Sequence, residues 1–317
     1  MRLVKNLCRI IVGIVFIYSG FVKGIDPLGS DYKFTDYFNA FGMGWMNATT
    51  LFFSFALSLT EFLIGIALLF NLWVSRMAWG SLLFMAFFTP LTLVLALTNP
   101  VSDCGCFGDA MILTNWQTFW KNIILLLLAI MIFMYRKEYK SSLPLVGQFS
   151  FLALAGAGML CLSVYCYRHL PVLDFRPYAV GKNITEGMRL PEGAEPDQYE
   201  VTLKYKNKQT GEVQSFTEEN YPWQDTLNWE YESSSERLVK KGYITPIHDL
   251  IIEHPTLGNI TEEILEDDNH TILAVAYNLT QSDMQYQPAI NRLAEYAQEK
   301  GIRFYGLTSS SERDIET

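Results

Sequence analysis

Five long apolar runs, separated by short polar interruptions, make up most of the first 170 residues. They are Leu7–Ile25, Leu51–Leu72, Met77–Leu97, Trp116–Tyr135 and Leu145–Tyr167. Each approaches the ~20 residues that an α-helix needs to cross the apolar core of a bilayer. The pattern therefore predicts five membrane-spanning helices. The first is expected to stay as an anchor, because it lacks the small-x-small site at which signal peptides are cleaved.

The polar connector after the first run carries a helical pattern of its own. Its aromatic residues fall at i, i+3, i+4 and i+7, namely Phe34, Tyr37, Phe38 and Phe41. This spacing predicts one aromatic stripe on a short helix. Two placements remain open: the helix lies in the membrane interface with its rings at headgroup depth, or the stripe packs onto the end of the bundle.

After residue 170 the pattern changes to short apolar stretches typical of a mixed α/β region. Tyr199–Phe216 alternates around a Gln-Thr-Gly-Glu turn and predicts a β-hairpin. Thr271–Tyr277 and Ile302–Leu307 read as strands on either side of a helix, which is expected to begin at a capping box in Ser282–Gln285 and to end at Gly301. A parallel βαβ unit follows. Either the hairpin completes its sheet, or the chain lacks a C-terminal piece.

The distribution of charged residues supports the same division of the chain near residue 170. Half of the 317 residues are hydrophobic and 18% are charged. Residues 1–170 carry 11 Lys and Arg against 7 Asp and Glu, whereas residues 171–317 carry 13 against 26. A mildly basic membrane part is thus joined to a strongly acidic tail, which argues against nucleic acid as a partner of that tail.

The basic residues also predict an orientation. With five spans, the ends on one side of the membrane carry most of the cations: Arg2, Lys5, Arg9, Arg76, Arg136, Lys137 and Lys140. The opposite side has only Lys23 and Lys33 in its first connector and none between the third and fourth spans. The positive-inside rule then places the N-terminus in the cytoplasm and the tail outside.

The polar loop between the third and fourth spans holds the sequence Cys104-Gly105-Cys106. An oxidising outer compartment allows a disulfide between these residues, and Gly105 gives the backbone freedom that so small a ring needs. A strained ring is easily reduced, which favours thiol exchange. The alternatives are a structural staple, two unpaired thiols or half of a zinc site, although no histidine occurs in the first 168 residues.

Glu61 is the second candidate, since it interrupts the second apolar run near its centre. An ionisable residue there suggests a proton relay or a partner for a quinone carbonyl. Alternatively, its protonated carboxyl bonds to Ser58, Thr60 or a neighbouring helix and only holds the bundle together. Lys23 is expected near the outer boundary, too far along the bundle for an easy ion pair with Glu61.

The remaining cysteines and histidines point to no metal site. Cys8 and Cys161 are expected to pack as small apolar side chains. Cys166 lies near the outer end of the fifth run, where it could meet the Cys-Gly-Cys loop as a resolving thiol. The tail histidines at 248, 254 and 270 show no ligand spacing.

These motifs resemble known families. Ser19-Gly20-Phe21-Val22-Lys23 with Asp26-Pro27, and Glu61 followed by Gly65, resemble the DoxX-like membrane proteins. Cys104-Gly105-Cys106-Phe107-Gly108 before the fourth span is similar to MauE, a methylamine-utilisation family of the same broad grouping. The resemblance covers about residues 3–135. It implies a four-helix bundle that acts in thiol or quinone redox chemistry, since MauE is linked to disulfide formation in a periplasmic enzyme subunit.

The tail resembles the thioredoxin-like part of longer DoxX-type proteins of Bacteroidetes. Where that family places Cys-x-x-Cys, this chain reads Thr280-Gln281-Ser282-Asp283, and residues 171–317 contain no cysteine. The tail therefore cannot exchange thiols itself, and a docking role is expected.

Together the sequence predicts an inner-membrane protein. Residues 1–140 form a DoxX-like all-α four-helix bundle, 141–170 a fifth crossing helix, and 171–317 a periplasmic α/β tail, thioredoxin-like from about 245. Cys104 and Cys106 are expected to pass electrons between a periplasmic thiol or client protein and an acceptor such as a quinone. The alternative is a non-catalytic scaffold in the membrane lipid, whose acidic tail docks a partner.

Overall fold

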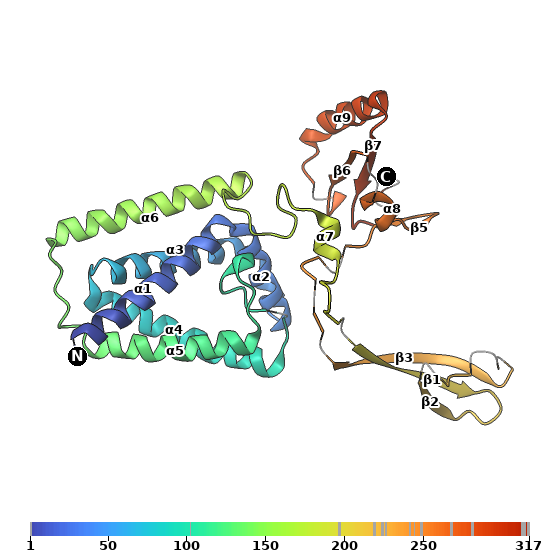
Figure 1. Ribbon diagram of the computed structural model, residues 1–317, viewed down its shortest axis with the longest axis horizontal. Helices are drawn as coiled ribbons and strands as arrows, with labels where there is room; N and C mark the ends of the chain where they lie inside the picture. Colours follow the sequence, from blue (N-terminus) through green and yellow to red (C-terminus); the bar gives the residue numbers. More distant parts are fainter. Residues whose placement is uncertain are drawn as a thin grey trace. The chain divides into compact units, whose positions relative to one another are not determined.

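The computed structural model divides the chain into two compact units, residues 1–180 and 181–317. It describes residues 2–101, 103–195, 198–217, 220–222, 225, 227–240, 242–243, 245–247, 250–266, 269–279, 282–311 and 315. The first unit is all-helical and the second is a small α/β region (Figure 1). This order matches the change of pattern in the sequence.

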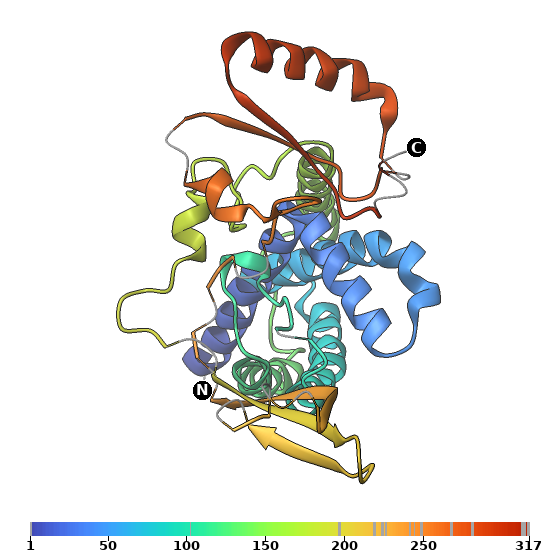
Figure 2. The same cartoon turned by 90° about the vertical axis from the view of Figure 1, so that its right-hand side faces the viewer.

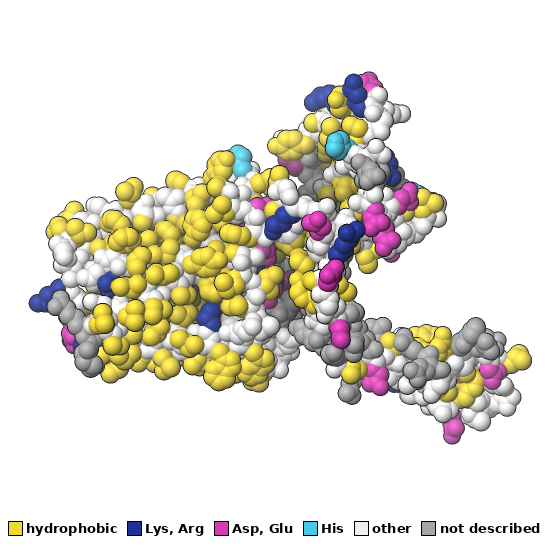
Figure 3. Space-filling view, viewed as in Figure 1, with side chains coloured by type: hydrophobic (Ala, Val, Ile, Leu, Met, Phe, Trp, Pro, Cys, Tyr) yellow, Lys and Arg dark blue, Asp and Glu magenta, His cyan; other side chains and the backbone are white. Residues whose placement is uncertain are grey.

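Five helices of the first unit are long and apolar enough to cross a membrane, judged by length and composition. They are α1 (Arg2–Ile25), α3 (Thr50–Leu69), α4 (Val74–Thr98), α5 (Asn115–Met134) and α6 (Leu145–Arg168). Hydrophobic side chains cover most of the face of this unit seen in Figure 3, and few charged ones appear among them. Such a surface suits contact with lipid rather than water.

A sixth helix, α2 (Pro27–Ala40), runs across one end of the bundle, as the two views in Figure 1 and Figure 2 show. The Asp26 carboxylate accepts a hydrogen bond from Gly29 N at 3.1 Å, and Pro27 occupies the first turn. This cap starts α2 and breaks it from α1. The rings of Phe34 and Phe38 pack on Phe53 of α3 at 6.1 and 6.0 Å, so this part of the aromatic stripe covers the bundle end.

Helices α1 and α3 approach each other so closely that their backbones touch. A Cβ at Gly20 would lie 2.5 Å from Phe62 N, and one at Gly65 would lie 2.5 Å from Ile17 N. Only glycine fits at such a contact. In α6, by contrast, a Cβ at Gly158 would meet nothing within 4 Å. The structure therefore shows no close helix contact at Gly158, whereas a Cβ at Gly156 of the same helix would lie 3.2 Å from Leu63 of α3.

Two short 3-10 helices complete the helical unit: η1 (Gly44–Thr49) before α3, and η2 (Gly108–Ala110) in the loop between α4 and α5. A capping box starts α5, in which Gln117 N donates to Thr114 Oγ1 and Thr114 N donates to Gln117 Oε1. The α4–α5 loop that carries the two cysteines is thus bounded by sharply defined helix ends.

The described residues of the second unit form three small sheets. The expected hairpin is present as β1 (Gln198–Asn207) and β2 (Val213–Thr217), and the sequence missed β3 (Trp229–Lys240), which pairs antiparallel with β1. Between this sheet and the βαβ unit lie the short strands β4 (Glu253–His254) and β5 (Gly258–Asn259), and α8 (Thr261–Leu265). A short helix, α7 (Ile184–Met188), precedes β1.

The βαβ unit is confirmed as β6 (Thr271–Val275), α9 (Gln287–Lys300) and β7 (Arg303–Leu307), with the two strands parallel. Gly301 ends α9 at φ +67°, as expected. The predicted capping box is wrong: α9 starts at Gln287 after η4 (Met284–Tyr286), and Ser282 Oγ donates to Asn278 O. Within the described residues this sheet keeps two strands, and a complete thioredoxin-like sheet is not seen.

Candidate functional site

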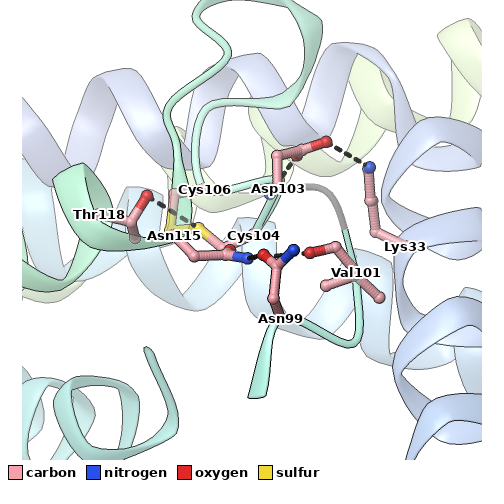
Figure 4. Close-up of polar contacts among 9 residues, drawn as sticks. Lys33, Asn99, Val101, Asp103, Cys104, Cys106, Asn115 and Thr118 are labelled. Carbon is pink, nitrogen blue, oxygen red and sulfur yellow. Dashed lines mark hydrogen bonds and ion pairs between the residues drawn. A yellow bond between two sulfur atoms is a disulfide. The ribbon is translucent and has the colours of Figure 1, made fainter. Parts of the chain in front are cut away.

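The loop between α4 and α5 closes on itself through a disulfide between Cys104 and Cys106 (Figure 4). The two Cα atoms are 5.5 Å apart, and Gly105 between them adopts φ +62°, a conformation that favours glycine. A turn follows, in which Gly108 N donates to Gly105 O at 3.1 Å. The motif thus forms a disulfide-closed bend.

Polar contacts from several elements hold this bend in place. Asp103 forms an ion pair with Lys33 of α2 at 2.7 Å, and its other carboxylate oxygen accepts from Gly105 N at 2.8 Å. Ser19 of α1 donates to Cys106 O at 2.8 Å. At the start of α5, Asn115 donates to Val101 O at 2.9 Å. The bend therefore has a defined position over the bundle.

Beneath the disulfide lies a cavity of about 80 Å³ whose wall contains both cysteines. Helices α1 to α5 all contribute side chains to this wall. Among them are Lys23 of α1, Glu61 of α3 and Lys121 of α5. The structure thus brings the two candidate sites, the Cys-Gly-Cys loop and Glu61, together around one cavity.

Glu61 forms an ion pair with Lys23 in the floor of this cavity. The Lys23 ammonium lies 2.6 and 2.7 Å from the two carboxylate oxygens, and both residues are buried. The expectation that Lys23 lies too far along the bundle is wrong, because α1 and α3 are in backbone contact and the lysine side chain reaches down into the bundle. Ser58, considered as a partner of Glu61, instead donates to Phe55 O of its own helix.

Phe107 connects the loop to a second lysine. Its ring is buried, lies edge-on to Tyr18, and carries the Lys121 ammonium 4.4 Å from its centroid. Lys121 also interacts electrostatically with Lys23 and Glu61. The sequence reading did not single out Lys121, although a lysine inside an apolar run is a signal of the same kind as Glu61.

The other candidates lie apart from this cavity or serve the fold. Gly20 packs against α3 and Asp26 caps α2. Gly108, at φ +51°, closes the turn after the disulfide. Cys8 and Cys166 are buried free thiols, as is usual for packing cysteines, whereas the free thiol of Cys161 is exposed. No group of three metal-ligating side chains occurs among the described residues, and His248 lies outside them.

Two parts of this chain match the sequence models of protein families. Residues 1–135 match the family model of methylamine utilisation protein MauE. That match spans α1 to α5 with the Cys-Gly-Cys loop and stops before α6. Residues 199–241, which contain the sheet of β1, β2 and β3, match the model of a domain of unknown function, DUF8463. Neither the curated proteins nor the solved structures include a match to this chain.

Proposed function

We propose that the Cys104–Cys106 disulfide is a redox pair that exchanges electrons with thiol proteins. The observation that carries this proposal is the shared cavity, since both cysteines line the same wall as a buried ion pair and a further lysine. A staple that only closes a loop needs no charged groups beneath it. Charged groups inside a bundle are costly and usually serve a function.

The proposed reaction is thiol–disulfide exchange. A thiolate of a partner protein attacks one sulfur of the pair, and the Cys104–Cys106 bond breaks. A second partner thiol then resolves the mixed disulfide. The partner gains a disulfide, and the two electrons and two protons it gives up leave Cys104 and Cys106 as thiols. The glycine between them lets the bend accommodate both states.

A quinone is the acceptor that the resemblance to DoxX-like and MauE proteins implies, and the cavity wall meets one of its two requirements. The chemistry of the wall fits, because Lys23, Lys121 and Ser19 could donate hydrogen bonds to a ring carbonyl beside aromatic side chains. The volume does not fit: about 80 Å³ is roughly half of the ~150 Å³ cavity that admits benzene. No step is therefore assigned to a quinone.

The basic residues support a location for this exchange. We place the loop on the periplasmic face of the inner membrane and the N-terminus in the cytoplasm, following the positive-inside rule. After reduction, a membrane-impermeant maleimide added to intact spheroplasts should label Cys104 and Cys106. Labelling only after the membrane is opened would contradict this orientation.

Trapping experiments test the exchange itself. In the full-length protein in its membrane, Cys104→Ser and Cys106→Ser each leave one loop thiol able to hold a partner. We expect mixed disulfides with at least one variant and altered thiol status of periplasmic proteins. Cys161→Ser is the matched control, because it removes an exposed thiol outside the loop. If neither loop variant traps a partner and thiol status is unchanged, the proposal fails.

One observation favours a second function, a non-catalytic scaffold whose acidic tail docks a partner. The bend is anchored by the Lys33–Asp103 ion pair and by hydrogen bonds from α1 and α5, as a structural staple would be. The reduction potential separates the two functions. A value below about −300 mV would favour the staple, and a higher value the exchange.

A further inference from the structure

The two sulfurs of the disulfide have different surroundings. Cys104 Sγ lies 3.5 Å from Thr118 Oγ1 of α5 (Figure 4). A disulfide sulfur carries no hydrogen, so the hydroxyl is the donor of this contact. Thr118 is fully buried, which fixes its position. In the described part of the chain no such donor contacts Cys106 Sγ, and the contact of Cys106 with Ser19 is made through its backbone oxygen.

The charges around the cavity also favour a negative group near α5. Lys23 is balanced by Glu61, and Lys33 by Asp103. Lys121 has no carboxylate within ion-pair distance among the residues that the structure describes, and it follows Thr118 by one helical turn. The described charged residues of the cavity lining, counted together with Asp103 that pairs with Lys33, therefore carry one positive charge in excess.

The direction of α5 also favours a negative charge on Cys104. Cys104 contacts the fourth residue of a 20-residue helix that has no acidic side chain in its first turn. The N-terminal end of a helix carries a partial positive charge, and a thiolate there is stabilised. The hydroxyl donor at Cys104 and a helix N-terminus thus come from one element, α5, and the same helix supplies the Lys121 ammonium to the cavity wall that both cysteines share.

We propose that the two cysteines have separate roles, in which a partner thiolate attacks Cys106 and the electron pair of the broken bond stays on Cys104 as a thiolate held by Thr118 and Lys121. This inference rests on the proposed exchange reaction. The partner sulfur bonds to Cys106 Sγ, and Cys104 leaves with a negative charge. Thr118 and Lys121 are positioning residues, because they act on the leaving sulfur and not on the partner.

The ionisation of each thiol tests this assignment in the reduced, full-length protein in detergent. The ultraviolet absorbance of thiolate is followed against pH for Cys106→Ser, which keeps Cys104, and for Cys104→Ser, which keeps Cys106, and the double variant is subtracted to remove the signal of the three thiols outside the loop. The charged groups that line the cavity are Lys23, Lys33, Glu61 and Lys121, with Tyr37 as a further titratable group, and the wall from α4 has none. Asp103 pairs with Lys33 beside them. We expect Cys104 to ionise about one pH unit or more below Cys106.

Two substitutions connect that difference to α5. Lys121→Gln and Thr118→Val, each combined with Cys106→Ser, should move the ionisation of Cys104 upward by about one pH unit for the lysine and less for the threonine. Lys121→Arg and Thr118→Ser keep the charge and the hydroxyl and should restore it. Val and Ser are close in size to Thr, so both variants are expected to fold, and gel filtration checks this before each titration.

Trapping separates this inference from the proposed function. Cys104→Ser should trap a partner on Cys106, whereas Cys106→Ser should trap at least tenfold less. Equal trapping by both variants, or ionisation of Cys104 at or above that of Cys106, overturns the assignment and leaves the exchange reaction standing. Absence of trapping by either variant contradicts the exchange reaction, and the ionisation measurements still decide the assignment.

Discussion

Lys23, in the last turn of α1, places its ammonium 2.6 Å from the carboxylate of Glu61, in the middle of α3. Both side chains are at least nine-tenths buried. Two groups that would each be costly inside a bundle therefore neutralise each other. The same pair forms the floor of the cavity beneath the disulfide, so it contributes both to stability and to the electrostatics of the site.

Removing one partner of this pair should destabilise the bundle strongly. Lys23→Met leaves an uncompensated carboxylate, and we expect the free energy of unfolding in detergent to fall by about 3–5 kcal/mol. The double variant Lys23→Met, Glu61→Leu should recover most of that loss, because no charge is left buried. Glu138→Gln is the control: it breaks the Lys5 ion pair on an exposed carboxylate, where the change should be about 0–1 kcal/mol. Equal effects of the single and double variants would contradict the coupling.

The glycine contact between α1 and α3 should tolerate no side chain. Gly20→Ala places a methyl group against the backbone at Phe62 and Ser58, so the helices have to separate. We expect a loss of folded protein, measured by thermal unfolding and gel filtration in detergent. Gly158→Ala is the matched control in α6, where the added methyl meets nothing and the change should stabilise the helix by up to about 1 kcal/mol.

Asp103 should control how readily the disulfide is reduced. Asp103→Ala removes both the ion pair with Lys33 and the acceptor for Gly105 N. We expect dithiothreitol to reduce the disulfide about five-fold faster, corresponding to roughly 1 kcal/mol of lost hydrogen bonding. Asp103→Asn keeps an acceptor oxygen, so its rate of reduction should lie between those of the unchanged protein and Asp103→Ala. Glu138→Gln, at an exposed carboxylate that pairs with Lys5 of α1, should leave the rate unchanged. An unchanged rate in Asp103→Ala would show that these contacts do not restrain the loop.

The buried hydroxyl of Tyr37 should make the folded protein less stable at alkaline pH. Burial raises the pKa of its hydroxyl above the usual value near 10, and Asp103 and Asp36 raise it further. The folded protein then keeps a proton that the unfolded chain releases. Stability should therefore fall as the pH rises past about 10. Tyr37→Phe should reduce this fall in unfolding experiments, and Tyr32→Phe, on the same helix but exposed, should not.

The sequence predicted the helices well, because their signals are local. Long apolar runs located all five spanning helices to within a few residues, except that α1 begins earlier, at Arg2. Gly211 and its neighbours located the hairpin for the same reason. The third strand of that sheet was missed because Trp229–Lys240 is mostly polar and exposed, so it lacks the alternation that marks a half-buried strand.

The candidate site was predicted in parts but not as a whole. Cys104, Cys106 and Glu61 stood out by residue type and position. They line one cavity because of the position of α1 along α3, and the close contact at Gly20 fixes that position. Thr118 has no local feature that marks a site, whereas Lys121 interrupts an apolar run as Glu61 does and could have been singled out on that ground. Only the packing of α5 beside the loop shows what they contact.

The ion pair also has a consequence for how the chain enters the membrane. Lys23 leaves the ribosome 38 residues before Glu61. During that interval α1 carries an ammonium without the carboxylate that neutralises it in the folded bundle. We therefore expect α1 and α3 to enter the bilayer together, as a hairpin unit. Biogenesis of this protein is thus coupled to the same two side chains that line its cavity.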